Sequence, residues 1–552
     1  MSLLDTGAEP LELVGCVPYP ADVARRYRDR GYWQGRCLDD LLRDAARDHP
    51  ARPAVVAIDD RLDYAHLDAR VERLAAGMAA EGIVRGDRVV VQLPNVAAFV
   101  VTVFALWRVG ALPVFALPAH RRSEVEHFCR LSEAAGYITC GRHDGFDHAA
   151  LAAELAGSVG SLRLVAVHDA TGDHEPDEVV RSLVDLERDE PAPRGVSHSS
   201  DVAFLQLSGG TTGTPKLIPR THDDYLYSVR ESARICGLDE SSVLLVALPV
   251  AHNFAMSSPG ILGAVAVGGT IVLAPDASAS TVLGLIERER ATIVPAVPTL
   301  ALAWLNAPER ATADLSSLQV LQVGGARLSE SVARRAMAEL GCVVQQVFGM
   351  AEGLVNYTRL GDDVETCVTT QGLRISSDDE VMVTDDDGRP VPIGTPGHLL
   401  TRGPYTIRGY YRANEHNARA FTDDGFFRTG DIVVERADGY LTVVGRSKDQ
   451  INRAGEKIAP EEVENHLLAH PSVHDVSVVG KLDELVGERI CAHVVLRPGT
   501  PPLRPADLRR HLRARGIAAF KIPDEVLFVE HLPATAIGKV DRRSLREREE
   551  RP

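Results

Sequence analysis

The most informative stretch of the 552-residue chain is Leu205-Gln-Leu-Ser-Gly-Gly-Thr-Thr-Gly-Thr-Pro-Lys216. Leu205 and Leu207 predict the end of a buried strand, and Ser208 to Lys216 contain three glycines, four hydroxyl side chains and one lysine. Glycine lets backbone N–H groups come close to a polyanion, and the hydroxyl groups and the ammonium add donors and positive charge. The stretch therefore predicts a loop that binds nucleotide phosphates, rather than a flexible surface loop.

This loop differs from the Walker P-loop. The Walker pattern requires Gly-Lys followed by Ser or Thr, whereas Pro215 stands before Lys216 and Leu217 follows it. Because proline has no backbone N–H, we do not expect a helix to begin there as it does in a P-loop. ATP hydrolysis that drives a motor is disfavoured for the same reason.

Length and composition limit the class of protein. The chain is long enough for two or more domains, and its 45% hydrophobic and 25% charged residues are typical of a soluble globular protein. The formal net charge of −17 argues against nucleic-acid binding. The N-terminus has no secretory pattern, and the most apolar stretch, Val96–Trp107, is too short to span a bilayer. We expect a cytoplasmic protein that binds neither nucleic acid nor membrane, with its eight cysteines reduced.

Short apolar strands alternate with helices over most of the chain, and this alternation predicts parallel sheets in an α/β fold. Asn95 is expected to cap the helix that follows it. Strands are expected at Arg88–Leu93, Ala111–Leu117, Leu162–His168, Val243–Leu248, Thr270–Ala274, Thr292–Val297 and Leu318–Val323, and helices at Val96–Trp107, Glu124–Ala135 and Ser280–Arg290.

The last third of the chain has a different pattern of predicted strands and helices. From Glu380 to Val444 the pattern is β-rich, with Gly-Pro, Asp-Gly and Asp-Asp turns that predict a compact β subdomain. After Asp449 a small α+β unit is expected, and we place a domain boundary at Lys448, which gives a core over residues 1–447 and a C-terminal domain over residues 448–552. Its elements are helices at Pro460–His470 and Pro505–Arg515 and strands at Val473–Gly480, Arg489–Leu496 and Glu525–Val529.

Further motifs occur in a fixed order: Gly324-Gly-Ala326, Gln346–Glu352, Gly397–Gly403, Arg428-Thr-Gly-Asp431, Gly445–Lys457 and Gly538-Lys539. This set resembles the adenylate-forming superfamily of acyl-CoA synthetases, peptide-synthetase adenylation domains and luciferases, and it covers nearly the whole chain. Within the superfamily the chain is most similar to the stand-alone aryl-acid AMP ligases of siderophore biosynthesis. The stretches that carry this similarity are Ile218–Tyr225, Ala251–Gly260 and Val347–Tyr357.

The resemblance implies a large α/β core and a small mobile C-terminal domain. It also implies a reaction in two steps, in which a carboxylate attacks the α-phosphorus of ATP with release of pyrophosphate, and the acyl adenylate then passes its acyl group to a thiol. Because charge builds on the phosphoryl oxygens, fixed cations and N–H donors are the largest catalytic contribution. Lys539 is expected to neutralise the attacking carboxylate and the α-phosphate, and Glu352 to hold Mg²⁺.

The remaining nucleotide contacts are also implied by the resemblance. Phe348 fills a position where tyrosine is usual, and Ala351 stands where many relatives have threonine, so a hydroxyl contact to AMP is expected to be absent. Taken singly, Glu352, Asp431 and Lys539 would be ordinary surface or turn residues; the joint order of the motifs gives them roles. The assigned residues are Ser208, Gly209, Gly210, Thr211, Thr212, Gly213, Thr214 and Lys216 at the β- and γ-phosphates, Gly324, Gly325 and Phe348 around the adenine, Asp431 and Arg446 at the ribose, and Val347, Gly349 and Lys457, also at the nucleotide.

The acid pocket is expected between His252–Gly260 and the turn at Gly353–Val355. An amide at Asn253 suits a carboxylate or ortho hydroxyl, and Phe254 suits a flat ring. Ser258 and Val355 resemble the specificity residues of 2,3-dihydroxybenzoate enzymes, whereas Phe254, in place of tyrosine, favours salicylate, so both acids stay open. His252 receives no proton-transfer role. The pocket is completed by Ala326 and Met350.

The acceptor is expected to be a separate aryl carrier protein that bears a phosphopantetheine thiol, because no carrier-like serine motif follows the adenylating region. A basic run, Leu508–Arg515, offers Arg509, Arg510 and Arg513 to an acidic helix, or is only a solvated helix face. Two other functions remain open: an aryl-CoA ligase that uses coenzyme A, and a luciferase-like oxygenase. The pocket residues Asn253 and Ser258 are too polar for the second.

Overall fold

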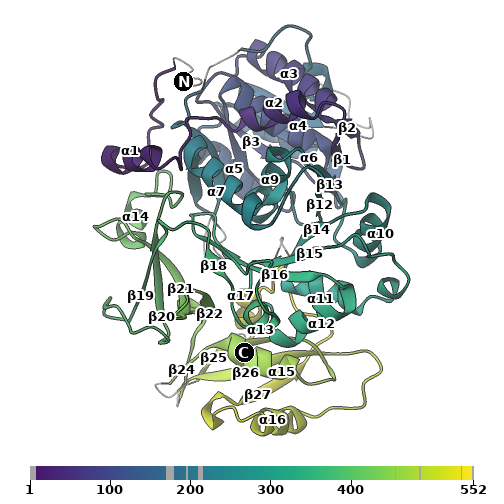
Figure 1. Cartoon of the computed structure of the whole chain (residues 1–552), viewed down its shortest axis with the longest axis vertical. Coiled ribbons are helices and arrows are strands. Elements are labelled where there is room, and N and C mark those ends of the chain that lie inside the picture. Colours follow the sequence, from purple (N-terminus) through teal and green to yellow (C-terminus); the bar gives the residue numbers. More distant parts are fainter. Residues whose placement is uncertain are drawn as a thin grey trace.

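The computed structural model describes residues 8–168, 180–193, 197–208, 215–453, 456–483, 486–535 and 538–549. Its core contains a nine-stranded sheet, a seven-stranded sheet and a smaller antiparallel sheet, and a five-stranded sheet forms the C-terminal domain (Figure 1). The predicted α/β class, with parallel-sheet subdomains, a β subdomain and a small α+β C-terminal part, is confirmed.

The nine-stranded sheet is parallel except at its two ends. On one face it packs against α10, α11 and α12, through a cluster that includes Leu302 and Leu321. In order across the sheet the strands are β18 (Leu373–Arg374), β17 (Val355–Tyr357), β16 (Val343–Gly349), β15 (Val320–Gly324), β14 (Ile293–Ala296), β12 (Val243–Val246), β13 (Thr270–Leu273), β1 (Pro53–Val56) and β2 (Arg61–Asp63).

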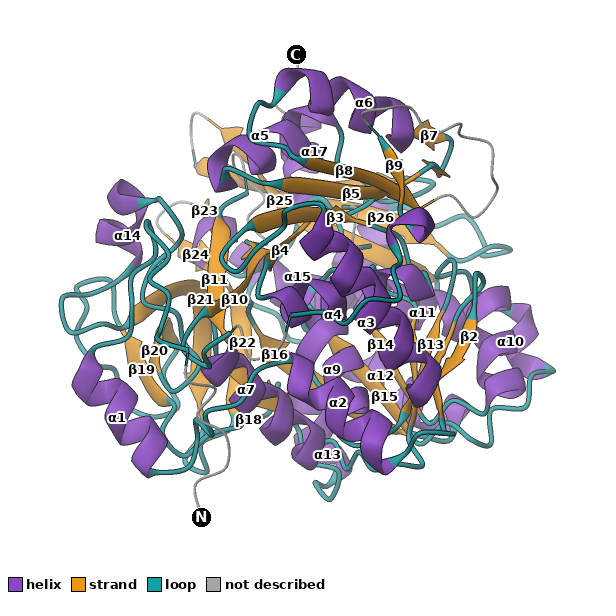
Figure 2. Cartoon of the chain, turned by 90° about the horizontal axis from the view of Figure 1, so that it is seen from above, coloured by secondary structure: helices purple, strands orange, loops and turns teal. Residues whose placement is uncertain are grey.

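The seven-stranded sheet is parallel except for the pair β10 and β11. Helices α5 and α6 cover its outer face through a cluster that includes Phe128 and Leu155 (Figure 2). The order is β11 (Leu217–Thr221), β10 (Val202–Leu207), β4 (Leu112–Phe115), β3 (Arg88–Gln92), β5 (Gly136–Cys140), β8 (Leu164–His168) and β9 (Arg181–Ser182), and a short hairpin joins β6 (Arg142–His143) to β7 (Phe146–Asp147).

The predicted helix Val96–Trp107 is the central helix of the core. It is α4 (Ala97–Val109), and all of its residues are buried in the cluster that joins the two large sheets. The prediction that Asn95 caps it is wrong. Asp59 accepts from the N–H groups of Ala97 and Ala98 instead, because the Asn95 amide is used to donate to strand-end carbonyls at Val246, Leu248 and Ala274.

The β subdomain is the antiparallel sheet β19 (Glu380–Thr384), β20 (Gly397–Arg402), β21 (Phe427–Glu435) and β22 (Leu441–Arg446). The C-terminal sheet has its own core, which includes Val463, Val478 and Leu512. Its strands are β23 (Ile451–Arg453), β24 (Glu456–Ile458), β25 (Val473–Asp483), β26 (Gly487–Leu496) and β27 (Glu525–Phe528).

The helices begin and end within three residues of the predicted positions wherever a helix was predicted. The bounds are α1 (Ala21–Asp29), α2 (Asp39–Asp48), α3 (Tyr64–Ala80), α5 (Arg122–Ser132), α6 (His148–Ser158), α7 (His222–Ile235), α8 (Asn253–Ser257), α9 (Gly260–Ala266), α10 (Ala279–Glu289), α11 (Pro298–Asn306), α12 (Glu330–Leu340), α13 (Val364–Thr369), α14 (Asn414–Ala420), α15 (Pro460–Leu468), α16 (Pro505–Ala514) and α17 (Arg542–Glu549).

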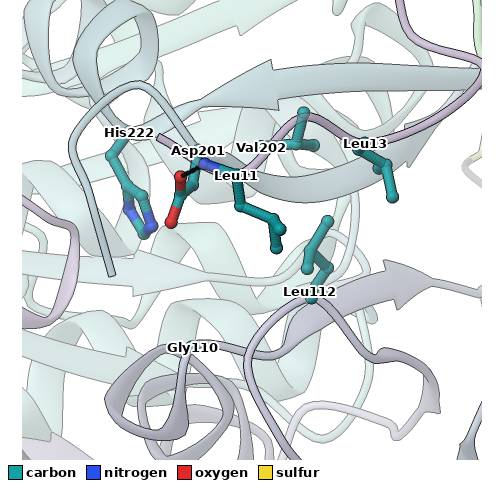
Figure 3. A pocket seen from close by; sticks show the side chains of 8 residues that line it. Leu11, Leu13, Gly110, Leu112, Asp201, Val202 and His222 are labelled. Carbon is teal, nitrogen blue, oxygen red and sulfur yellow. Dashed lines mark hydrogen bonds between the residues drawn. The ribbon is translucent and has the colours of Figure 1, made fainter. Parts of the chain in front are cut away.

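The N-terminal segment lies across the edge of the core. Leu11 and Leu13 cover a small cavity beside Leu112 and His222, and the backbone N–H of Leu11 donates to Asp201, 2.8 Å away (Figure 3). Among the described residues no helix is both long and apolar enough to cross a bilayer. All eight cysteines lie in the described part of the chain and are free thiols.

Candidate active site

The predicted phosphate loop connects two paired strands. Strands β10 and β11 are antiparallel, and the backbone N–H groups of Ser208 and Lys216 bond across the base of the loop, to the Lys216 carbonyl (2.9 Å) and the Ser208 hydroxyl (3.0 Å). A strand rather than a helix follows Lys216, so the predicted difference from a P-loop is confirmed. The other predicted loop residues, Gly209, Gly210, Thr211, Thr212, Gly213 and Thr214, lie outside the described part of the chain.

Lys216 and Glu352 meet at a tyrosine that the sequence did not indicate. The Tyr410 hydroxyl donates to Glu352 Oε1 (2.8 Å), and the Lys216 ammonium lies 5.8 Å from the centre of the Tyr410 ring. Burial raises the pKa of Glu352. Apart from Tyr410, no described side chain donates to the Glu352 carboxylate, so this buried group can still accept a cation.

Lys539 comes from the C-terminal domain and lies against Gly325, at the end of β15. The turn is held by Thr299 Oγ1, which donates to the Gly538 carbonyl (2.5 Å). Gly325 has a φ of +82°, a backbone conformation that favours glycine, and a Cβ there would lie 2.5 Å from Lys539 Cε, so Lys539 packs directly against it. Burial, reinforced by Arg446, lowers the pKa of Lys539 to about 8.

Asp431 and Arg446 face each other on neighbouring strands of the β subdomain. They are paired in the register of β21 and β22, and Arg446 Nε donates to Asp431 Oδ1 (3.0 Å). Asp431 is 4% exposed, and its burial raises the pKa of the carboxyl, while Arg446 opposes that shift. Asp431 and Arg446 both act electrostatically on Lys539, so these three predicted residues lie together.

The predicted acid pocket is built around α8. Tyr225 donates to Asn253 Oδ1 (2.9 Å), which leaves the Asn253 Nδ2 group to donate elsewhere. Phe254 is buried, and a Cβ on Gly324 would lie 3.0 Å from its ring, so the pocket adjoins the glycine pair of the nucleotide site. His252 caps α8, and burial together with Lys539 lowers its pKa to about 3, so it is neutral.

Ser258 has two buried hydroxyl neighbours that the sequence did not indicate. Ser232 on α7 and Tyr357 on β17 are fully buried, and the Tyr357 hydroxyl lies beside those of Ser232 and Ser258. Neither the Ser232 nor the Tyr357 hydroxyl has a hydrogen-bond partner among the described residues. Ser258 itself is 4% exposed, so three buried hydroxyl groups lie together beside α8.

Arg220, for which the sequence predicted no role, contacts both the turn that carries Glu352 and the tyrosine next to Asn253. Its guanidinium is buried and donates to Asp224 Oδ1 (2.8 Å), the Ala351 carbonyl (2.9 Å) and the Tyr405 carbonyl (3.1 Å). It also lies over the Tyr225 ring, 4.7 Å from the ring centre. Arg220 therefore positions both the turn that carries Glu352 and the tyrosine that orients Asn253.

The other predicted residues lie on neighbouring strand ends. Phe348 and Met350 pack partly buried against the β subdomain, Val347 and Val355 are buried, and Gly349 and Ala326 are exposed. Lys448 lies in a short turn between β22 and β23, where its carbonyl accepts from Arg546 Nη1 (3.5 Å). Lys457 lies on β24, but its side chain, like residue Gly455, is outside the described part of the chain.

Two family models match the chain, "AMP-binding enzyme" over residues 42–411 and "AMP-binding enzyme C-terminal domain" over residues 462–539. The chain belongs to this family of adenylate-forming ligases, which use ATP.

Individual relatives match nearly the whole chain. It is 53% identical to the 2,3-dihydroxybenzoate-AMP ligase of Bacillus subtilis (97% of this chain, 98% of the relative). It is 45% identical to the salicyl-AMP ligase / salicyl-S-ArCP synthetase of Mycobacterium tuberculosis (97% and 94%). Among solved structures, the apo structure of Mycobacterium smegmatis MbtA matches with a TM-score of 0.73 and 44% identity (97% and 98%).

Proposed function

We propose that the chain activates a 2-hydroxybenzoic acid with ATP and then transfers the aryl group to the phosphopantetheine thiol of a separate aryl carrier protein. One observation carries the proposal: Lys539 packs against Gly325, where its charge interacts with Asp431 and Arg446 and also with His252, the residue before Asn253. A cation at that place is suited to a carboxylate that attacks a phosphate. The printed names of the relatives, which specify 2,3-dihydroxybenzoate and salicyl groups, support an aryl acid.

In the first step the carboxylate oxygen bonds to the α-phosphorus of ATP, and the bond to the pyrophosphate oxygen breaks. Lys539 neutralises the two reacting anions, while Lys216 and the loop from Ser208 bind the β- and γ-phosphates. The Asp431 carboxylate, fixed by Arg446, accepts from the ribose hydroxyls. The remaining assigned residues, Gly324, Gly325, Val347, Phe348 and Gly349, surround the adenine.

Glu352 is suited to hold Mg²⁺. Mg²⁺ prefers carboxylate oxygen, and it is usually bound by one or two carboxylates together with substrate phosphates. Glu352 has one oxygen fixed by Tyr410 and no second side-chain donor among the described residues, and it lies near the lysine of the phosphate loop. When bound, Mg²⁺ supplies positive charge to the phosphate oxygens.

The buried hydroxyl groups next to Ser258 favour one of the two candidate acids over the other. A buried hydroxyl without a partner costs roughly 1–3 kcal/mol, and a 3-hydroxyl on the substrate ring would give the group of Ser258, Tyr357 and Ser232 a partner. This favours 2,3-dihydroxybenzoate. Salicylate is the second candidate, because Phe254 makes the opposite wall apolar.

For the second step we propose that residues 448–552 rotate about Lys448, away from the core of residues 1–447. The C-terminal domain has a separate hydrophobic core, and its contacts with the first domain include one hydrogen bond at Thr299 and two at Asn306. Both features suit a rigid unit that changes its orientation. Rotation would replace Lys539 by the segment that contains Gly455 and Lys457.

The set of arginines on α16 proposed to contact the carrier protein is smaller than the sequence predicted. Arg509 donates to the carbonyls of Pro523 and Asp524, so it is committed within the domain. Arg510 and Arg513 are exposed and are the residues we propose for an acidic carrier.

The acceptor is tested by mass spectrometry of the product. The full chain is incubated with ATP and 2,3-dihydroxybenzoate, and either a phosphopantetheinylated aryl carrier protein or coenzyme A is added. We expect rapid loading of the carrier and slow formation of aryl-CoA, with loading slowed at low salt by Arg510→Glu together with Arg513→Glu. Aryl-CoA formed as fast as the loaded carrier would instead identify an aryl-CoA ligase.

A further inference from the structure

A second polar site lies between the core and the C-terminal domain, at the end of α11 away from Lys539. A cavity of about 200 Å³ separates α11 and α12 from the C-terminal domain, which lies below them in Figure 1. Leu302, Val332 and Arg335 line it from the core, and His470, His474 and Arg497 line it from the C-terminal domain. No residue that lines the cavity is acidic, and all of them lie in the described part of the chain.

Two guanidinium groups from different domains meet at one neutral acceptor beside this cavity. Arg335 Nη2 and Arg497 Nη1 each donate to Asn306 Oδ1, both at 3.2 Å. Asn306 Nδ2 lies 3.2 Å from His474 Nδ1. Two cations that share a single uncharged oxygen repel each other, and Asn306 itself supplies no negative charge to this contact between the domains.

The nearby Glu339 carboxylate does not neutralise the excess positive charge. Glu339 accepts from Arg335 Nε (3.0 Å) but also pairs with Arg310 (3.3 Å), so one negative charge faces three arginines. The Nη1 atom of Arg335 is buried and has no described partner. Burial and Arg335 together lower the pKa of Arg497, as expected for a cation held beside a like charge.

We infer that this cavity is a binding site for a small oxyanion of the phosphate type, which bridges Arg335 and Arg497. Guanidinium groups bind the oxygens of phosphate in a fixed two-donor geometry, and the apolar walls at Leu302 and Val332 strengthen the attraction. Because each domain supplies one arginine, the anion binds only in this domain orientation. The same orientation places Lys539 against Gly325, so the anion stabilises the orientation for adenylation by mass action.

The test uses the full-length protein and inorganic phosphate, with chloride at matched ionic strength as the reference. We expect saturable phosphate binding by calorimetry and a rise in Tm. Arg335→Gln and Arg497→Gln should each weaken that binding roughly tenfold or more, because each removes a charge-assisted hydrogen bond. Arg310→Gln is the matched control, since Arg310 shares Glu339 but does not line the cavity. All variants should keep the wild-type Tm in chloride.

Binding that is unchanged in Arg335→Gln and Arg497→Gln would overturn the inference, because it would place the phosphate elsewhere, for example at the loop of Lys216. A second measurement rests on the proposed function: phosphate should slow carrier loading in the wild type and not in the two variants. Pyrophosphate exchange with the aryl acid, measured in parallel, separates the outcomes. Normal exchange together with equal slowing in all three proteins would overturn the bridging role, whereas absent exchange would instead contradict the proposed activity.

Discussion

Lys539 packs directly against Gly325, whose positive φ favours glycine. The same close packing removes water from the ammonium, which is why its pKa falls to about 8 although Asp431 opposes the shift. The residue that must be cationic therefore titrates close to physiological pH. This single feature links the glycine motif, the C-terminal lysine and the pH dependence of the reaction.

The first prediction concerns that pH dependence. Lys539 is charged below its pKa and neutral above it, so kcat/KM for adenylation should be flat below about pH 8 and fall at higher pH. The measurement is ATP–pyrophosphate exchange from pH 6.5 to 10.5. Aryl transfer from a supplied adenylate is the control and should lack this fall. A midpoint near 10.5 would show that Lys539 is not desolvated in the free enzyme.

The second prediction concerns the ring substituents. Ser258→Ala removes a hydroxyl from the group shared with Tyr357 and Ser232, and a lost hydrogen bond of this kind costs about 1–3 kcal/mol. The kcat/KM for 2,3-dihydroxybenzoate should therefore fall by roughly tenfold relative to salicylate. Tyr357→Phe should shift the same ratio in the same direction by a smaller factor. If both variants keep the wild-type ratio, the hydroxyl group does not select the acid.

At the scale of elements, most strands and helices could be predicted from hydrophobic pattern. The strand before the phosphate loop, the buried helix α4 and the alternation that makes parallel sheets all follow from local sequence. The cap of α4 could not be predicted, because Asp59 reaches it from a distant segment. Tyr410 is 58 positions from Glu352, and its role depends on how the chain folds back rather than on a motif.

The third prediction belongs to α11, which links the core to the C-terminal domain through Thr299. Thr299→Val keeps the shape of the side chain but removes the hydrogen bond to the Gly538 carbonyl. A net loss of about 1 kcal/mol should lower the exchange rate roughly fivefold. Transfer from a supplied adenylate should be unaffected or faster, since Lys539 is released more easily. Equal losses in both half-reactions would indicate damage to the core instead.

At the scale of the whole molecule, one chain must carry out two half-reactions with one set of pocket residues. The structure has Lys539 at the site, so it corresponds to the orientation we propose for adenylation. The turn at Lys448 connects two units with separate hydrophobic cores, and Arg546 contacts this turn from α17. We propose that a change of backbone angle at this turn exchanges Lys539 for the segment near Lys457.

The fourth prediction tests this rotation. Lys448→Pro fixes φ at the turn and should hold the C-terminal domain in one orientation. We expect pyrophosphate exchange within about twofold of the wild type, but strongly slowed loading of the carrier protein. The matched control is Lys448→Ala, which changes the same side chain without fixing φ. Impaired exchange with normal loading would contradict the assigned orientation.

We expect the chain to form an aryl adenylate from a 2-hydroxybenzoic acid with the help of Lys539. Acid-dependent ATP–pyrophosphate exchange, measured across a panel of aryl acids, tests it most directly. We predict strong exchange with 2,3-dihydroxybenzoate and salicylate and weak exchange with benzoate. For Lys539→Ala, whose fold is checked by circular dichroism, we predict a loss of roughly 10²–10³-fold. No exchange with any hydroxybenzoate, or undiminished exchange in Lys539→Ala, would contradict the account.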